Sequence, residues 1–142
     1  MSSRGFSNRG TLKGDETRVK VKSMDTLEAI HGLKWLAPNW NSYGAKAPDE
    51  PTVTRAVSYL AAVVRALGQA YAQPEVAPIP DPGIALIWRD RWRPEQAEAV
   101  EVLVTPERAE WVLLKEHRIV DHGAAHDPAD FALNILKRHV SL

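Results

Sequence analysis

The stretch Asn39-Trp40-Asn41-Ser42-Tyr43-Gly44-Ala45 lies between two segments of helical periodicity, so it predicts a corner between two helices. Two aromatic side chains, two amides, a hydroxyl and a glycine are unusual in a connector, because loops are rich in small polar residues. One interpretation is structural: Trp40 and Tyr43 close one end of the core while the amides cap helix termini. The other is that the corner binds a ligand or a partner. We favour the structural interpretation, and it covers Asn39, Trp40, Tyr43 and Gly44.

Both segments that flank this corner have an apolar face of helical spacing. In the first, Ser23 is suited to cap a helix and Pro38 to end it. Its apolar face holds Leu27, Ile30 and Trp35. The second begins at 48–51, Pro-Asp-Glu-Pro, where proline is tolerated in the first turn. Its stripe comprises Val53, Val57, Leu60, Ala61, Val64, Leu67 and Tyr71. We therefore expect two N-terminal helices.

The second half of the chain has the pattern of strands. Residues 74–83 contain four prolines, so they predict an extended crossover that ends in a turn. Short apolar or alternating runs then follow at 84–88, 97–104, 109–114 and 118–120, which predict an antiparallel meander of three to four strands. Asp127-Pro128-Ala129-Asp130 is a typical helix start. The expected fold is α+β, with the C-terminal helix packed on the sheet.

Length and composition indicate a single domain. The chain has 142 residues, of which 44% are hydrophobic and 25% charged, as in ordinary globular proteins. It contains no cysteine, no run near the ~20 apolar residues that span a bilayer, and no signal-peptide pattern. We therefore expect a cytoplasmic protein without membrane contact, with its folded domain at 23–142.

The first 22 residues form a separate, basic segment. They carry six basic and two acidic groups, a net charge of +4, whereas the rest of the chain carries 12 basic and 16 acidic groups. Residues 1–16 are too poor in apolar groups to fold alone, and 17–22 alternate as an edge strand would. Such an arm can contact nucleic acid or an acidic partner, or it can be a solvated tail. The contacts expected from it are Arg4, Arg9 and Lys13.

A second basic run, residues 88–93, follows one of the predicted strands. If the strand continues, Arg89, Arg91 and Arg93 point to one side, where they could follow phosphates. Trp92 could stack on a base. The alternative is structural: Trp88 belongs to the core, Trp92 lies at its rim, and the arginines pair with Asp90, Glu95 or Glu98.

Motifs for chemistry are weak. His122 and His126 are four residues apart among aspartates, but they precede the helix cap, so helical metal-ligand geometry is not expected. The sequence has no nucleophile elbow, phosphate loop or dinucleotide fingerprint. We therefore expect no catalytic residue, metal or cofactor, and a protein that is not an enzyme.

The quoted motifs resemble those of small bacterial and phage-associated proteins of uncharacterised function. That family shares a motif like Asn-Trp-Asp-Ser-Tyr-Gly-Ala, a long helix, a Pro-Asp-Gly-Gly turn and a strand that ends in tryptophan. The matching residues here are 39–45, 80–83, 84–88 and 100–104, within a resemblance that covers about 27–114. This chain departs from the pattern at Asn41, Pro82 and Ile87. The resemblance implies one compact domain and brings no known activity.

The sequence therefore predicts a non-catalytic interaction protein within a larger assembly, whose basic arm and 88–93 run contact nucleic acid or a nucleoprotein. The alternative is a protein-only inhibitor, of the antitoxin or phage counter-defence type. A small metal-dependent hydrolase is a distant third. Salt separates the first two, because phosphate contacts weaken steeply with salt whereas an apolar interface does not. The partner and the oligomeric state are not specified by these patterns.

Overall fold

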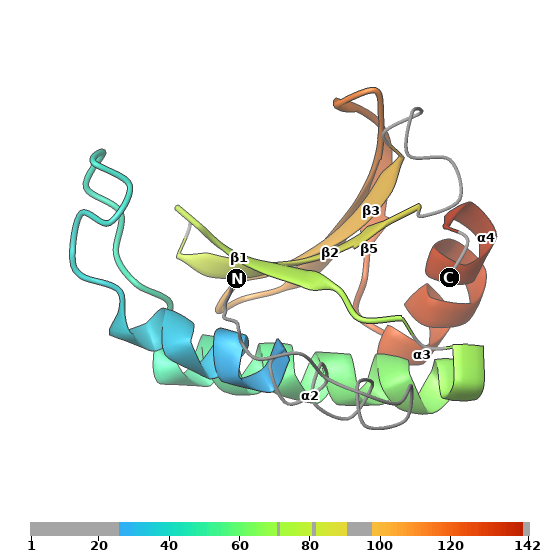
Figure 1. Cartoon of the computed structure of the whole chain (residues 1–142), viewed down its shortest axis with the longest axis horizontal. Coiled ribbons are helices and arrows are strands. Elements are labelled where there is room, and N and C mark those ends of the chain that lie inside the picture. The colour runs from blue at the N-terminus through green and yellow to red at the C-terminus, as the bar shows by residue number, and fades with distance from the viewer. Residues whose placement is uncertain (1–25, 71, 81, 91–97, 141–142) are drawn as a thin grey trace, which may run out of the picture.

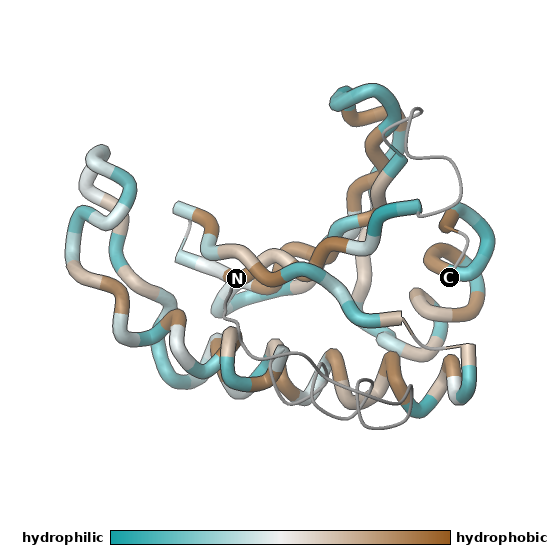
Figure 2. Tube along the Cα trace, viewed as in Figure 1, coloured by the Kyte–Doolittle hydropathy of each residue, from teal (hydrophilic) through white to brown (hydrophobic). Residues whose placement is uncertain are grey.

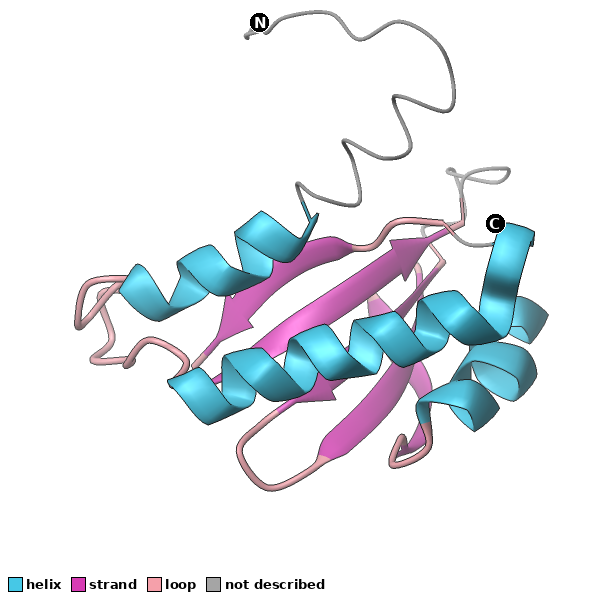
Figure 3. Cartoon of the chain, turned by 90° about the horizontal axis from the view of Figure 1, so that it is seen from below, coloured by secondary structure: helices cyan, strands magenta, loops and turns pink. Residues whose placement is uncertain are grey.

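The computed structural model describes residues 26–70, 72–80, 82–90 and 98–140. It has an α+β fold, in which helices pack against one face of an antiparallel sheet (Figure 1). The predicted fold class is confirmed. Seen from below, α2 and the helical segment ahead of it lie in front of the strands (Figure 3).

The sheet is a five-stranded meander, in which each strand pairs with the next one along the chain. Its strands are β1 (Glu75–Ile79), β2 (Gly83–Arg89), β3 (Ala99–Val104), β4 (Ala109–Lys115) and β5 (Arg118–Ala124). The prediction of three to four strands was too low. The missed strand is β1, which lies in the proline-rich stretch that was expected to be a crossover. Prolines are tolerated there because β1 is an edge strand of the sheet that the described residues form, where one side of the backbone has no neighbouring strand among them.

Local signals explain the long helix α2 (Glu50–Leu67). The Asp49 side chain caps it by accepting the Thr52 N–H at 2.9 Å, and Gly68 ends it with a positive φ of 58°. Hydrophobic residues repeat along α2 in Figure 2, and the buried ones include Val53 and Leu60. Ahead of α2, the described residues hold only a shorter helical segment, 26–32, continued by the 3-10 turn Leu33–Trp35. Of the two expected N-terminal helices, the second is therefore the long helix α2, and the first is described only as this shorter segment.

The C-terminal helical segment starts where the sequence predicts. Asp127 accepts the N–H groups of Ala129 (3.0 Å) and Asp130 (3.2 Å), so it is the expected N-cap. The segment consists of α3 (Pro128–Phe131), a π-helical turn (Ala132–Leu136) and α4 (Lys137–His139).

Three aromatic rings join the helices to the sheet. The ring of Phe131 lies 5.9 Å from that of Trp88 on β2 and 6.1 Å from that of Tyr59 on α2, measured between centroids. Trp88 is fully buried and donates its indole N–H to the Ala72 carbonyl at 2.9 Å. This confirms the structural interpretation of Trp88 as a core residue. Burial of such large rings contributes much of a small domain's stability.

Candidate functional site

The corner loop, residues 36–49, links the first helical segment to α2 and extends away from the rest of the chain (Figure 1). Its tip is the motif 39–45. The corner loop combines an exposed aromatic side chain, Tyr43, with a hydrogen-bonded backbone, and a second exposed aromatic residue, Trp35, directly precedes it.

Asn39 closes the tip of the loop through three hydrogen bonds. Its backbone N–H donates to the Ala45 carbonyl at 2.8 Å, and its carbonyl accepts the Ser42 N–H at 3.0 Å. Its side-chain Oδ1 accepts the Gly44 N–H. The two ends of the motif are therefore tied to each other rather than to a helix terminus, so the prediction that the amides cap helices was wrong.

The side chain of Asn41 also holds the backbone of the loop tip. Its Oδ1 accepts the N–H groups of Tyr43 at 2.9 Å and Ala45 at 3.2 Å. The Trp40 indole N–H donates to the Lys46 carbonyl at 3.1 Å, which braces the side of the loop that leads into α2. The hydrogen bonds of Asn39, Trp40 and Asn41 together fix the backbone around Tyr43.

Three residues of the tip have positive φ: Asn39 (64°), Ser42 (65°) and Gly44 (84°). Glycine takes this conformation without strain and asparagine does so more readily than most residues, whereas serine pays a cost. No atom lies within 4 Å of a Cβ built on Gly44, so its requirement for glycine is one of backbone conformation and not of space. Strained backbone of this kind persists where surrounding contacts hold it, and it is frequent at functional sites.

The aromatic side chains of this region face solvent. Tyr43 is 91% exposed and Trp35 is 78% exposed. Trp40 is half-buried and lies outside the buried core cluster. The prediction that Trp40 and Tyr43 close one end of the core was therefore wrong, because the loop extends beyond the core instead of folding over it.

Trp35 is the functional candidate that the sequence interpretation missed. It was assigned to the apolar face of the first helix, but it lies in a 3-10 turn whose register differs from that of an α-helix. Hydropathy does not reveal the exposed aromatics either, since tryptophan and tyrosine are near neutral on this scale and the loop tip is pale to teal in Figure 2. The feature of the sequence that pointed to this region was the aromatic content of the connector 39–45, which follows Trp35 closely.

The charges near Trp35 are balanced. The Lys34 Nζ lies 5.3 Å from the centroid of the Trp35 ring, within reach of a cation–π interaction. The same Nζ forms an ion pair with Glu50 at 3.1 Å. The cation that faces Trp35 is therefore already paired with an acid.

The predicted nucleic-acid contacts fall mostly outside the described residues. Only Arg89 is described, and it lies exposed at the end of β2, where its Nε donates to the Glu75 carboxylate on β1 at 2.8 Å. The structure thus pairs this arginine with an acid, although not with the acid that the sequence suggested. Six residues lie outside the described ranges: Arg4, Arg9, Lys13, Arg91, Trp92 and Arg93.

A half-buried carboxylate lies near this ion pair. Glu101 on β3 and Glu75 on β1 are both in register with Ile87, on the sheet face opposite α2. Burial raises the pKa of the Glu101 carboxyl, Arg89 counteracts that rise, and Glu75 adds to it. Arg89 and Glu75 are thus the charged side chains that influence Glu101.

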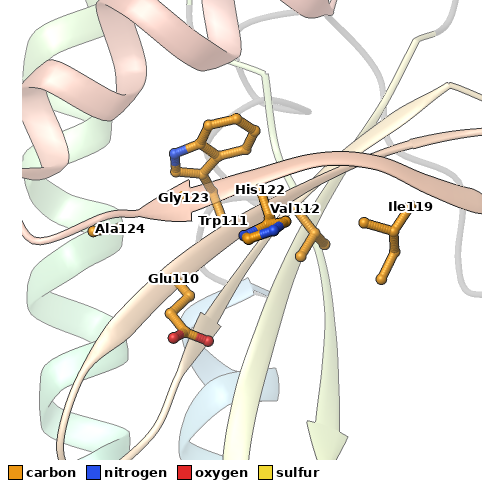
Figure 4. Close-up of a pocket in the computed structure, with 7 residues that line it drawn as sticks. All are labelled: Glu110, Trp111, Val112, Ile119, His122, Gly123 and Ala124. Atoms are coloured by element: carbon orange, nitrogen blue, oxygen red, sulfur yellow. The ribbon is translucent and has the colours of Figure 1, made fainter.

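The two histidines do not come together as ligands. His122 is on β5, which runs further than predicted, and His126 follows that strand. Within the described ranges, no three histidine, aspartate or glutamate side chains cluster as metal ligands would. His122 and Glu110 instead line a shallow hollow of about 340 Å³ on β4 and β5, with Trp111 directed to the other side of the strands (Figure 4). Glu110 is paired there with Arg108 at 2.9 Å.

Comparison of the chain with protein-family models, with curated proteins and with solved structures finds no match. Across the described ranges, no helix combines the length and the apolar character needed to cross a membrane. The geometry of the chain's own residues is therefore the basis for assigning a function.

Proposed function

We propose that this protein is an interaction module that binds a partner protein through the corner loop. The observation that carries the proposal is the 91% exposure of Tyr43 on a tip whose backbone is held by side-chain and main-chain hydrogen bonds. Exposed aromatic residues usually cost a protein solubility, and tyrosine and tryptophan are enriched among residues that dominate binding energy at interfaces. A rigid tyrosine gives a large contact area for little loss of conformational entropy.

The surroundings of the loop favour a protein over a nucleic acid as the partner of this site. Lys34 is already paired with Glu50, and Asp49 caps α2, so among the described residues of the loop and its flanks phosphates would meet the single side chain of Lys46 and not a basic cluster. An apolar pocket that accepts Tyr43 and packs on Trp35 suits the site better. These features support the alternative of a protein-only inhibitor, or of an adaptor, and we propose a non-catalytic role inside an assembly in the cytoplasm.

Contact with nucleic acid through the arm and the 88–93 run stays a prediction, since all of its expected contacts except Arg89 lie outside the described ranges. Kinship with the small bacterial and phage-associated proteins that carry a similar corner motif is likewise a proposal, based on residues 39–45, 80–83, 84–88 and 100–104.

The test is site-specific crosslinking in cells of the organism that encodes the chain. A photo-reactive phenylalanine derivative replaces Tyr43 in one variant and Leu133 in another, because Leu133 is a 48% exposed residue on the C-terminal helical segment. We expect a defined protein adduct from position 43, reduced by Trp35→Ala, and none of the same mass from position 133. Equal adducts from both positions, or none from position 43, would contradict the proposal.

A further inference from the structure

We infer that Asn41 is a positioning residue, whose side-chain oxygen holds Tyr43 in its binding conformation before the partner arrives. This inference rests on the proposed function, because it explains how the corner loop would bind and not merely that it binds. It assigns Asn41 a role that needs no contact between its own side chain and the partner.

The geometry assigns this role to one atom. Asn41 Oδ1 accepts two backbone N–H groups, those of Tyr43 and Ala45, at 2.9 and 3.2 Å. A carbonyl oxygen has two lone pairs, so this is its full capacity. Because both neighbours are N–H donors, the side-chain atom that faces them must be the oxygen and not the amide nitrogen. The Nδ2 group has no hydrogen-bond partner within the described ranges.

Order in the free protein matters for binding, because any backbone freedom that is lost on association lowers the affinity. The two bonds to Asn41 span the residues on both sides of Gly44, so they restrict the segment that carries Tyr43. Without them, Tyr43 would have the same exposure but many orientations. The expected consequence is weaker binding with no loss of any direct contact.

Asn41 also permits a cleaner test than Asn39. Asn39 has a positive φ, so any substitution there changes backbone preference as well as the hydrogen bond. Asn41 is not among the residues with positive φ, so the role to be tested is that of its side-chain oxygen as a hydrogen-bond acceptor. Asn41→Asp keeps that acceptor and gives it a charge, which strengthens hydrogen bonds from N–H groups. Asn41→Leu has a similar size and no acceptor.

The first measurement is amide hydrogen exchange by NMR on the full chain and these two variants. We expect the Tyr43 and Ala45 amides to exchange at least about tenfold faster in Asn41→Leu, and as slowly as in the unsubstituted chain, or more slowly, in Asn41→Asp. The amide of Val53, which donates to the Asp49 carbonyl in α2, serves as the internal control and should not change. Unchanged exchange in Asn41→Leu would overturn the inference.

The second measurement is the crosslink yield from position 43 in the same two backgrounds. The yield should fall in Asn41→Leu and be kept in Asn41→Asp. A loop that loses protection in Asn41→Leu but keeps its full crosslink yield would refute the positioning role and leave the proposed function intact. If position 43 gives no adduct even with Asn41 present, the proposed function fails, and the exchange result still decides whether Asn41 orders the loop.

Discussion

The indole N–H of Trp40 donates to the carbonyl of Lys46 at 3.1 Å, so this tryptophan braces a loop instead of filling the core. Removal of a core tryptophan costs about 3–5 kcal/mol. For Trp40→Ala we expect a smaller loss of about 1–2 kcal/mol, from one hydrogen bond and partial burial. Urea denaturation of the variant measures it, and a loss in the core range would show that the indole packs in the interior after all.

Phe131 is expected to be a much larger contributor to stability. It is fully buried and contacts both Trp88 and Tyr59, so it connects the C-terminal segment to the sheet and to α2. Phe131→Ala should lower the free energy of unfolding by about 3–5 kcal/mol. Leu133→Ala, two residues further on and exposed, should change it by less than about 0.5 kcal/mol. Similar losses for both variants would argue against the observed orientation of this segment.

The raised pKa of the Glu101 carboxyl should make the stability of the protein depend on pH. Its pKa is raised from 4.5 in the folded chain, chiefly by burial, so ionisation is less favourable folded than unfolded. The resulting penalty grows as the pH rises through 4.5 and is complete above the folded pKa. Glu101→Gln should therefore be more stable than the unsubstituted chain at pH 7, and this advantage should disappear below pH 4.5. Thermal unfolding at pH 7 and pH 4 tests the sign, and a destabilised variant at pH 7 would contradict it.

The basic arm allows a test of the nucleic-acid prediction. If the N-terminal residues contact phosphates, binding to single- or double-stranded DNA should weaken with salt, and each lost contact should reduce the logarithmic slope by about 0.7–0.9. Replacement of Arg4, Arg9 and Lys13 by alanine should then lower both the affinity and the slope. If the affinity for DNA is the same at low and high salt, and the same with and without these three side chains, the arm does not bind nucleic acid.

The sequence correctly predicted the structural features that depend on residues close together in the chain. Asp127 caps its helix as expected, and the buried stripe of α2 follows the helical period, because both depend on neighbours within one turn. The strand β1 was missed because four prolines obscure an edge strand, whose tolerance for proline depends on its place in the sheet.

The corner loop shows where sequence patterns stop being informative. The composition of residues 39–45 identified an unusual connector, but the burial of Tyr43 depends on where the loop lies relative to the core, which no local spacing encodes. Asparagine side chains can cap a helix or close a loop with the same N–H···O geometry. Only the three-dimensional arrangement distinguishes these roles for Asn39 and Asn41.

The most direct test of the central claim is the affinity of the crosslinked partner for Tyr43→Ala, measured by calorimetry beside the melting temperature of the variant. The tyrosine side chain is 91% exposed, so its removal should leave the melting temperature unchanged. As an interface anchor it should contribute about 2 kcal/mol or more, which corresponds to a loss of affinity of about 30-fold or greater. Leu133→Ala should bind as the unsubstituted chain does. Full affinity in Tyr43→Ala would contradict the assignment of the corner loop as the binding site.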